Sequence, residues 1–294
     1  MKILVTGREG QVVTSLIERA ALHDDVEVVA LGRPELDLSD AEGVERAVAA
    51  SGADVVVSAA AYTAVDQAED EPDVAQAVNG DGAGAVARGA AKAGIPVIHL
   101  STDYVFSGDK QGDYLETDPT GPVGAYGRSK LAGEEAVAAA NPRHVILRTA
   151  WVYSPFGKNF VKTMLRLAAD RDELSVVGDQ WGNPTSALDI ADAVLHIARS
   201  KQLAEGNDGI GIFHLSGTGR TNWSGFARHV LEASGVLDGP TARVKDIATA
   251  DYPTKARRPA NSCLSTDKLC AIYGWRSPDW QTSASTVVER LIKA

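Results

Sequence analysis

The sequence contains little cysteine and no long apolar run. Its 294 residues include two cysteines, Cys263 and Cys270. No histidine stands near them at metal-ligand spacing, so we expect two free core thiols and no metal site. No stretch of about 18 apolar residues occurs, which argues against a membrane-spanning helix. The first residues lead straight into a strand pattern and lack the features of a signal peptide. Together these features predict a soluble, cytoplasmic protein.

Positive charge is also scarce. Lysine and arginine number 29 against 39 aspartates and glutamates, which gives a formal net charge of -10. Such a chain has no broad cationic surface, so we expect neither a nucleic acid nor a membrane as a partner. A small anionic ligand, such as a nucleotide, would have to be met by local groups. One dense acidic cluster is expected to be a solvated helix edge; it comprises Asp66, Glu69, Asp70, Glu71 and Asp73.

Short apolar runs rich in valine and isoleucine alternate with stretches of helical spacing. The runs lack strict alternation, which is typical of strands buried on both faces. The pattern predicts an α/β fold, a Rossmann-type doubly wound parallel sheet. The expected strands are 2–5, 26–31, 54–58, 95–100 and 143–149, and the expected helices are 10–22, 40–50, 72–93 and 126–140.

The pattern becomes less regular after Thr149, where glycine and proline separate short elements. We expect residues 1–150 to form a dinucleotide-binding domain. The segment 187–216 contains a helical pattern and then a strand pattern, so we expect it to return to that domain. The rest of 151–294 is predicted to be mainly a smaller, substrate-binding lobe.

The first strand is followed by a glycine-rich turn, with Gly7 and Gly10 three residues apart and Val13 in the next place. In a dinucleotide-binding turn the first glycine allows a tight bend, and the second lets the backbone approach a pyrophosphate. The third allows close packing of helix and strand, and a branched Val13 there could push the helix outward. Arg33 ends the second strand, where an arginine can accommodate the 2'-phosphate of NADP. The turn therefore predicts NADPH as the cofactor, with NADH as the alternative.

Tyr126 and Lys130 are four residues apart, so a helix places them on the same face. This pair suits ketone reduction. A phenol with a pKa of about 10 is a poor acid at neutral pH, but a nearby ammonium and a bound nicotinamide cation stabilise the phenolate and bring its pKa closer to the working range. Thr102 ends the fourth strand, where its hydroxyl could bind the substrate carbonyl beside Tyr126. His99 lies further back on that strand and is expected to be a packed core histidine.

Seven ordered motifs resemble the extended short-chain dehydrogenase/reductase family, and within it the dTDP-4-dehydrorhamnose reductases. These motifs are the GxxGQ turn at 7–11, SAAAYTAVDQAE at 58–69, STDYVF at 101–106, YGRSKLAGE at 126–134, RTAWVY at 148–153, DQWGNPT at 179–185 and ARRPANS at 256–262. The resemblance implies that NADPH reduces the C4 ketone of dTDP-4-dehydro-L-rhamnose, giving dTDP-L-rhamnose.

The resemblance also assigns roles to individual residues. Thr102, Tyr126 and Lys130 would be catalytic, and Lys130 would also hold the nicotinamide ribose. Arg257 and Arg258 are candidate phosphate partners from the smaller lobe. The implied cofactor contacts are Gly7, Gly10, Gln11, Val12, Arg33, Asp37, Leu38, Ala61, Tyr62, Thr63, Tyr126 and Lys130, and the implied substrate contacts are Val65, Thr102, Asp103, Tyr104, Trp151 and Arg257.

Three alternatives stay open at this point. A sugar-nucleotide epimerase would keep tightly held NAD. A dehydratase would need a carboxylate base directly after Asp103, where Tyr104 stands. A similar domain also serves as a regulatory subunit of methionine adenosyltransferase, because a fold does not guarantee catalysis. Some family members are dimers bridged by magnesium through glutamates. Ser15 and Leu188 occupy those places, so we expect no metal bridge, and a monomer or weak homodimer.

Overall fold

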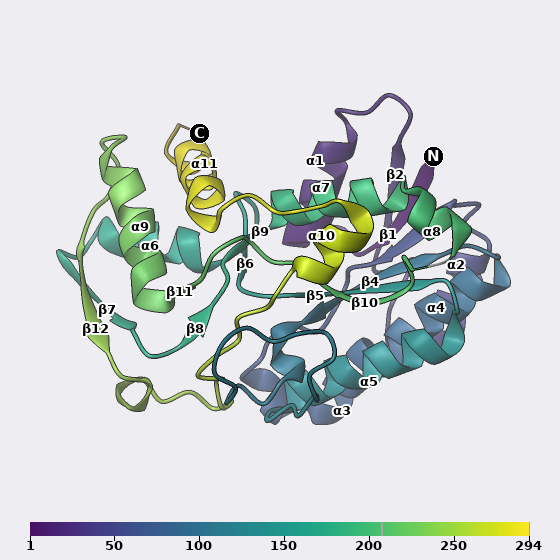
Figure 1. Ribbon diagram of the computed structural model, residues 1–294, viewed down its shortest axis with the longest axis horizontal. Coiled ribbons are helices and arrows are strands. Elements are labelled where there is room, and N and C mark those ends of the chain that lie inside the picture. Colours follow the sequence, from purple (N-terminus) through teal and green to yellow (C-terminus); the bar gives the residue numbers. More distant parts are fainter. Residues whose placement is uncertain (207, 294) are drawn as a thin grey trace.

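A parallel sheet forms the centre of the larger part of the molecule. Figure 1 shows the computed structural model, which describes residues 1–206 and 208–293. In this described part, the sheet has six strands in the order β10-β5-β4-β3-β1-β2, and every paired neighbour is parallel. The predicted fold class is confirmed. The strands are β1 (Lys2–Thr6), β2 (Glu27–Leu31), β3 (Val55–Ser58), β4 (Val97–Thr102), β5 (His144–Thr149) and β10 (Gly211–His214).

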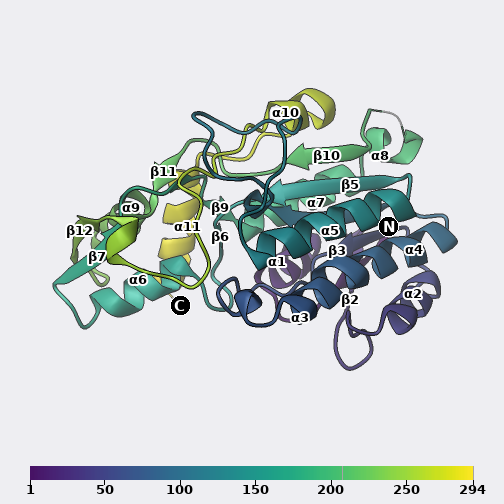
Figure 2. The same ribbon diagram turned by 90° about the horizontal axis from the view of Figure 1, so that it is seen from below.

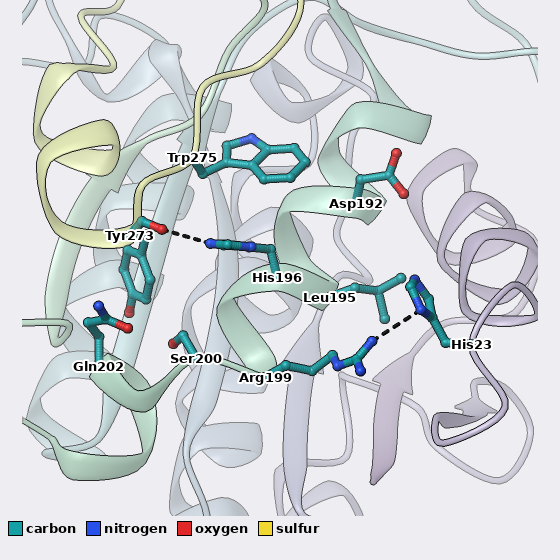
Figure 3. A pocket seen from close by; sticks show the side chains of 9 residues that line it. All are labelled: His23, Asp192, Leu195, His196, Arg199, Ser200, Gln202, Tyr273 and Trp275. Atoms are coloured by element: carbon teal, nitrogen blue, oxygen red, sulfur yellow. Dashed lines mark hydrogen bonds between the residues drawn. The ribbon is translucent and has the colours of Figure 1, made fainter.

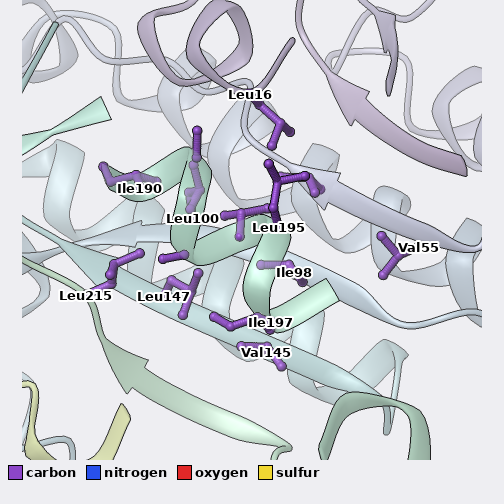
Figure 4. Packing of buried hydrophobic residues seen from close by; sticks show 14 of the residues in the cluster. Leu16, Val55, Ile98, Leu100, Val145, Leu147, Ile190, Leu195, Ile197 and Leu215 are labelled. Carbon is purple, nitrogen blue, oxygen red and sulfur yellow. The ribbon is translucent and has the colours of Figure 1, made fainter. Parts of the chain in front are cut away.

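Helices cover both faces of the sheet, and successive strand residues serve opposite faces. On β1, Ile3 and Val5 belong to one apolar cluster, and Leu4 belongs to another. The first cluster, drawn in Figure 4, packs the sheet against α1 (Gln11–Ala20) and α7 (Ala187–Ala198). The second packs it against α2 (Ala41–Ala49), α4 (Ala83–Lys92) and α5 (Ala125–Ala140). Burial on both faces explains the continuous apolar runs.

The helix predicted over 72–93 is interrupted. The chain forms α3 (Pro72–Gln76), then the π-helical turn η2 (Ala77–Gly82), and only then α4. Gly82 lies so close to the Leu38 carbonyl that a Cβ atom there would stand 2.5 Å from its oxygen. The absence of a side chain at Gly82 allows this contact at the end of the π-helical turn, and such turns are frequent at functional sites.

The smaller lobe has its own aromatic core, which includes Tyr153, Phe226 and Trp280. Figure 2 shows that β5 and β10 point their carboxyl ends toward this lobe. The lobe contains β6 (Val152–Tyr153), α6 (Phe160–Ala168), β7 (Glu173–Val177), β8 (Trp181–Gly182), β9 (Thr185–Ser186), β11 (Thr221–Asn222), α9 (Trp223–Gly235), β12 (Arg243–Ile247) and α11 (Trp280–Lys293).

Two later segments of the chain pack on the larger part of the molecule. The first supplies α7, α8 (Lys201–Glu205) and β10, and β10 pairs with β5 at the sheet edge. The second is α10 (Asp267–Tyr273), whose Leu269 and Tyr273 join the cluster around α7. No helix of the described chain is long and apolar enough to cross a membrane.

The strand order reverses between β1 and β3, the switch point at which open α/β sheets form their ligand crevice. From β1 the chain first moves outward to β2, and it then crosses back to β3 on the other side. Ligands of open α/β sheets bind at such a switch point, outside the carboxyl ends of the strands. The buried Thr6 joins the two strand ends, because its Oγ1 accepts hydrogen bonds from the N–H groups of Ala59 and Ala60, both at 3.0 Å.

Candidate active site

The glycine turn leads from β1 to the start of α1, at the switch point. Gly7 has a φ of +102°, which a residue with a side chain rarely adopts. Its N–H donates to the Leu31 carbonyl at 2.6 Å, which ties the turn to β2. Gly10 is the N-cap of α1 and supplies no capping side chain. The N–H groups of the first helical turn and the helix dipole are therefore available to a phosphate.

Val13, in the place of the third glycine, packs under the glycine turn. Its side chain is buried in the cluster that joins α1 to the sheet. A Cβ atom placed on Gly7 would stand 3.3 Å from Val13 Cγ2, so the valine fills the space under the turn. The side chain thus supplies apolar packing between helix and strand, and the same Cγ2 atom would stand 3.9 Å from a Cβ atom on Gly10.

Gln11 connects the glycine turn to the smaller lobe. Its Oε1 accepts hydrogen bonds from Ser154 Oγ at 2.8 Å and from Asn159 Nδ2 at 3.0 Å. Asn159 is also the N-cap of α6. The side chain of Gln11 therefore holds the lobe against the amino end of α1, and its backbone remains in the position that a pyrophosphate would face. The half-buried Val12 follows it in the same helical turn.

The residues after β2 and β3 border the same crevice. Arg33 is exposed at the end of β2. Asp37 accepts hydrogen bonds from the N–H and hydroxyl of Ser39, which lower the pKa of its carboxyl. Leu38 is buried against Gly82. After β3, Ala61 and Tyr62 are half-buried and Thr63 is exposed.

Asn79 organises this part of the site, although the sequence analysis did not select it. It is buried in the π-helical turn. Its Oδ1 accepts from Tyr62 N at 2.8 Å, and its Nδ2 donates to Tyr62 O and to Ser129 Oγ, both at 3.0 Å. Ser129 lies on α5 and donates to the Tyr126 carbonyl at 2.8 Å. Asn79 therefore joins the loop after β3 to the helix that carries Tyr126.

Tyr126 and Lys130 both face β4 from α5. Gly127, between them, allows a close approach, because a Cβ atom there would stand 2.2 Å from the Tyr104 carbonyl oxygen. The ring of Tyr126 meets that of Tyr104 edge-on, with centroids 5.7 Å apart. Thr102 ends β4, and its hydroxyl lies close enough to the Tyr126 phenol to lower the phenol's pKa. The structure therefore brings Thr102, Tyr126 and Lys130 together at one strand end.

The pKa of Tyr126 is raised, not lowered, in the protein without a ligand. Burial contributes most, the charge of Asp103 adds to it, and the Thr102 hydroxyl opposes it. The sequence-based expectation concerned the phenol with a nicotinamide cation bound, so it stays a prediction; without a ligand, burial and the charge of Asp103 dominate. Burial also lowers the pKa of Lys130 to about 8, against the opposing charge of Glu134. Lys130 is therefore mainly protonated at neutral pH.

Asp103 and Tyr104 follow Thr102 in the short helix η3 (Asp103–Val105). Asp103 is buried, and burial raises the pKa of its carboxyl to about 6. Its Oδ1 accepts from Thr102 Oγ1 at 2.9 Å, and its Oδ2 has no hydrogen-bond partner among the described residues. Tyr104 OH accepts from Arg258 Nη1 at 3.1 Å. An unpartnered buried oxygen beside the candidate acid is typical of a site that binds a polar ligand.

The sequence analysis expected the acidic cluster to be a solvated helix edge. Several of its carboxylates also bind groups elsewhere in the chain. Asp66 pairs with Arg258 at 2.6 Å, and Asp70 pairs with Lys255. Glu69 accepts from the N–H of Ala125 at 2.7 Å, which fixes the start of α5. The cluster therefore connects the 255–258 segment to the loop after β3. Arg258 already has a carboxylate partner, which weighs against its role as a free phosphate ligand.

The other expected substrate residues occupy different surroundings. Trp151 stacks on Trp223 with ring centroids 3.5 Å apart, and its φ of +48° directs the chain from β5 into the lobe. Val65 is half-buried in the loop after β3. Arg257 is exposed beside the paired Arg258. The sequence analysis also missed a buried ion pair behind Lys130, in which Arg148 Nη2 stands 2.7 Å from Glu134 Oε2.

A cavity of about 630 Å³ is lined by none of these site residues (Figure 3). Its walls come from α7, α8, the last residue of α10 and neighbouring loop residues. Two of its polar side chains already have partners, since Arg199 contacts His23 and Asp25, and His196 Nε2 contacts the Tyr273 carbonyl. Among the described residues, no cluster of three or more His, Cys, Asp or Glu residues is arranged to hold a metal ion.

Comparisons with known proteins agree with this geometry. The chain matches the family model described as RmlD substrate binding domain over residues 1–293. It is 52% identical over 292 residues to a dTDP-4-dehydrorhamnose reductase of Sinorhizobium fredii, a match that covers 99% of this chain and 98% of that protein. The solved structure of such a reductase from Clostridium acetobutylicum aligns with a TM-score of 0.91 at 36% identity, over 99% of both chains. Another, from Bacillus anthracis in complex with NADP, aligns with a TM-score of 0.89 at 31% identity, over 98% of this chain and 99% of that one.

Proposed function

The chain belongs to the RmlD substrate binding domain family, and we propose that it reduces the C4 ketone of dTDP-4-dehydro-L-rhamnose with NADPH, giving dTDP-L-rhamnose. The matches to dTDP-4-dehydrorhamnose reductases confirm the resemblance that the motifs indicated. The observation that carries the mechanism is the meeting of Thr102, Tyr126 and Lys130 at the carboxyl end of β4, beside the β1/β3 crevice.

The residues around the crevice fit a dinucleotide. The φ of +102° at Gly7 and the uncapped start of α1 at Gly10 form a cradle for a pyrophosphate. Asp37 and Leu38 would border the adenine, and Ala61 to Thr63 would line the remaining length. Lys130 would hold the nicotinamide ribose. When bound, NADPH supplies the hydride that this reaction requires.

The protein's own groups manage the proton and the carbonyl. Tyr126 donates its phenolic proton to the ketone oxygen as the oxygen gains negative charge. Thr102 would turn its one hydroxyl proton from Asp103 Oδ1 to the same oxygen and keep that oxygen beside the phenol. The Lys130 ammonium stabilises the phenolate that is left. Half-burial of Tyr126 keeps the phenol protonated until the substrate needs the proton.

Two features favour reduction over elimination. A dehydratase needs a carboxylate base after Asp103, but this place holds Tyr104, whose pKa is raised by burial. Tyr104 OH also accepts a hydrogen bond from Arg258, which occupies its oxygen. A neutral, engaged phenol is a poor base at neutral pH. We propose that Asp103, Tyr104, Val65, Trp151 and Arg257 bind the sugar nucleotide instead.

The direct test is an absorbance assay of NADPH oxidation with dTDP-4-dehydro-L-rhamnose. We expect oxidation that depends on this substrate, and dTDP-L-rhamnose as the product by mass spectrometry. The same sugar linked to UDP tests the nucleotide preference. A purified protein that carries stoichiometric NAD and needs no NADPH would indicate an epimerase. A stable complex with a methionine adenosyltransferase, without any NADPH oxidation, would indicate a regulatory subunit.

Arg33 is expected to set the preference for NADPH. Arg33→Met should raise the KM for NADPH by about 10- to 100-fold, because a hydrogen bond to a charged group contributes roughly 1.5–3 kcal/mol. The KM for NADH should change little, since NADH lacks the 2'-phosphate. Arg46→Met, an exposed arginine on α2, is the matched control. Equal changes for both cofactors would remove Arg33 from this role.

Three further parts of the proposal concern the domains, the oligomeric state and the location of the protein. We propose that residues 1–150, with about 187–216, form the cofactor unit, and that most of the remaining 151–294 forms the substrate lobe. A monomer or weak homodimer without a magnesium bridge is expected, and size-exclusion chromatography with light scattering measures this directly. A cytoplasmic location also stays part of the proposal.

A further inference from the structure

His99 stands directly behind the catalytic amine. It is buried on β4, and its Nε2 lies 3.4 Å from Lys130 Nζ. The carbonyl oxygen of Leu100, the next residue on the strand, accepts from Lys130 Nζ at 2.7 Å. On its other side, His99 Nδ1 lies 3.1 Å from Ser58 Oγ at the end of β3. The three side chains therefore form a buried chain, Ser58–His99–Lys130, that runs from β3 through β4 to α5.

The partners of His99 determine its tautomer. A lysine ammonium offers donors only, so the Nε2 atom that faces it must carry a lone pair. The proton of a neutral ring then lies on Nδ1, which donates to Ser58 Oγ. Burial and the positive charge of Lys130 both lower the pKa of His99 well below its usual value, so the ring stays neutral.

We infer that His99 is a positioning residue for the proposed reduction: its neutral Nε2, together with the Leu100 carbonyl, holds the Lys130 ammonium in its charged form and in a fixed orientation. An ammonium has three N–H donors. His99 Nε2 and the Leu100 carbonyl, both on β4, face two of these donors. The third N–H is left for the crevice side. Ser58 acts one step further back, because it fixes the ring tautomer that can accept.

Other titratable and charged groups also lie near Lys130. Tyr126 and Glu134 flank it on α5, and Glu134 pairs with Arg148 of β5. Asp103 follows β4 and acts on Tyr126. The carboxylate of Glu134 favours the charged lysine, whereas burial disfavours it. None of these groups would accept the Lys130 hydrogen bond in place of His99 Nε2, so loss of His99 should lower the pKa of Lys130.

The first test does not require any reaction. In the ligand-free protein with lysine labelled at ¹³Cε, NMR follows the titration of Lys130, whose signal is identified by its loss in Lys130→Arg. We expect a midpoint of about 8 in the parent protein. His99→Leu should lower the midpoint by about one pH unit or more, which corresponds to the loss of a hydrogen bond to a charged group. His99→Gln, which can place an amide oxygen near the Nε2 position, should restore most of it.

Ser58→Ala and His214→Leu separate this role from general packing. Ser58→Ala leaves the imidazole in place but frees its tautomer, so it should shift the midpoint in the same direction by a smaller amount. It also keeps the test open if His99→Leu fails to fold. His214 is another buried strand histidine, on β10, and it contacts the Ser265 carbonyl instead of Lys130. His214→Leu should leave the midpoint unchanged.

The second test rests on the proposed function and uses the pH profile of kcat/KM with NADPH and dTDP-4-dehydro-L-rhamnose. The alkaline limb should lie at about pH 8 in the parent, since deprotonated Lys130 no longer stabilises the phenolate. It should move to lower pH in His99→Leu and return in His99→Gln. An unchanged Lys130 midpoint in both His99→Leu and Ser58→Ala, or an equal shift in His214→Leu, would overturn the inference. Absence of turnover in every protein, with the NMR shifts as expected, would overturn only the proposed function.

Discussion

Tyr126→Phe is expected to reduce kcat by about 10²- to 10⁴-fold, the usual contribution of a positioned acid. The substitution removes one oxygen and keeps the ring that packs edge-on against Tyr104. The affinity for NADPH, measured by fluorescence quenching, should therefore change little. The rate is measured by NADPH oxidation at saturating substrate, so that a loss of binding does not imitate a loss of chemistry.

Tyr273→Phe is the matched control for this experiment. It removes the same atom from a buried tyrosine whose OH donates to the Gly209 carbonyl, and it lies on α10, in the cluster around α7. Its kcat should remain near that of the parent. Full turnover by Tyr126→Phe would assign the proton donor to another group. Asp103 would then be the first candidate, because its pKa of about 6 keeps part of it protonated near neutral pH.

The sequence predicted the parallel sheet because each strand carries its own signal. Strands covered on both faces must be apolar throughout, and the valine-rich run at 54–58 shows this directly. The order of the strands has no such local signal. The chain crosses from β2 back to β3, and this crossing places the switch point between β1 and β3. The path of the crossing depends on which face of the sheet each helix covers.

The site was predictable where a single segment carries it. The spacing of Tyr126 and Lys130 on one helix gave their common face, and the end of β4 gave Thr102. Asn79 was not found because its three hydrogen bonds join segments that are 17 and 50 residues away. A local signal was nevertheless present, since Asn79, Gly80 and Gly82 are poor helix formers within the predicted helix.

His99 and Arg258 show the limits of reasoning from one position. Burial of His99 was correctly predicted, but its partner Lys130 is 31 residues away, and only the packing of α5 on β4 brings them together. Arg258 is separated from Asp66 by 192 residues, so neither the arginine nor the acidic cluster revealed that they neutralise each other. The type of a residue indicates the roles that it can play. The residue that it contacts in the fold determines which of these roles it has.

Glu134→Gln is expected to lower the free energy of unfolding by about 3–5 kcal/mol, the range for a buried ion pair that loses one partner. Glu134 and Arg148 have side chains that are 2% and 3% exposed. Glu134 also accepts from Ser101 Oγ, and the guanidinium of Arg148 lies 4.9 Å from the centre of the Phe106 ring. The amide can keep hydrogen bonds but not the charge, so a buried guanidinium is left uncompensated.

Urea unfolding of the full chain, followed by circular dichroism, measures this loss. Glu135→Gln is the control, because this neighbouring glutamate on α5 is exposed. It should change the free energy of unfolding by less than about 0.5 kcal/mol, as surface substitutions usually do. Equal effects of the two substitutions would mean that the buried pair contributes no more to stability than a surface charge.

The double variant Glu134→Met/Arg148→Met distinguishes the cost of an unpaired charge from the value of the pair. Removal of both charges leaves no buried ion, so the double variant should be more stable than Glu134→Met or Arg148→Met alone. It should still impair turnover, since the carboxylate that favours charged Lys130 is gone. A double variant with parental stability and reduced kcat would show that this ion pair serves the amine of the site more than the fold. Stability losses that simply add would instead show that the two charges do not interact.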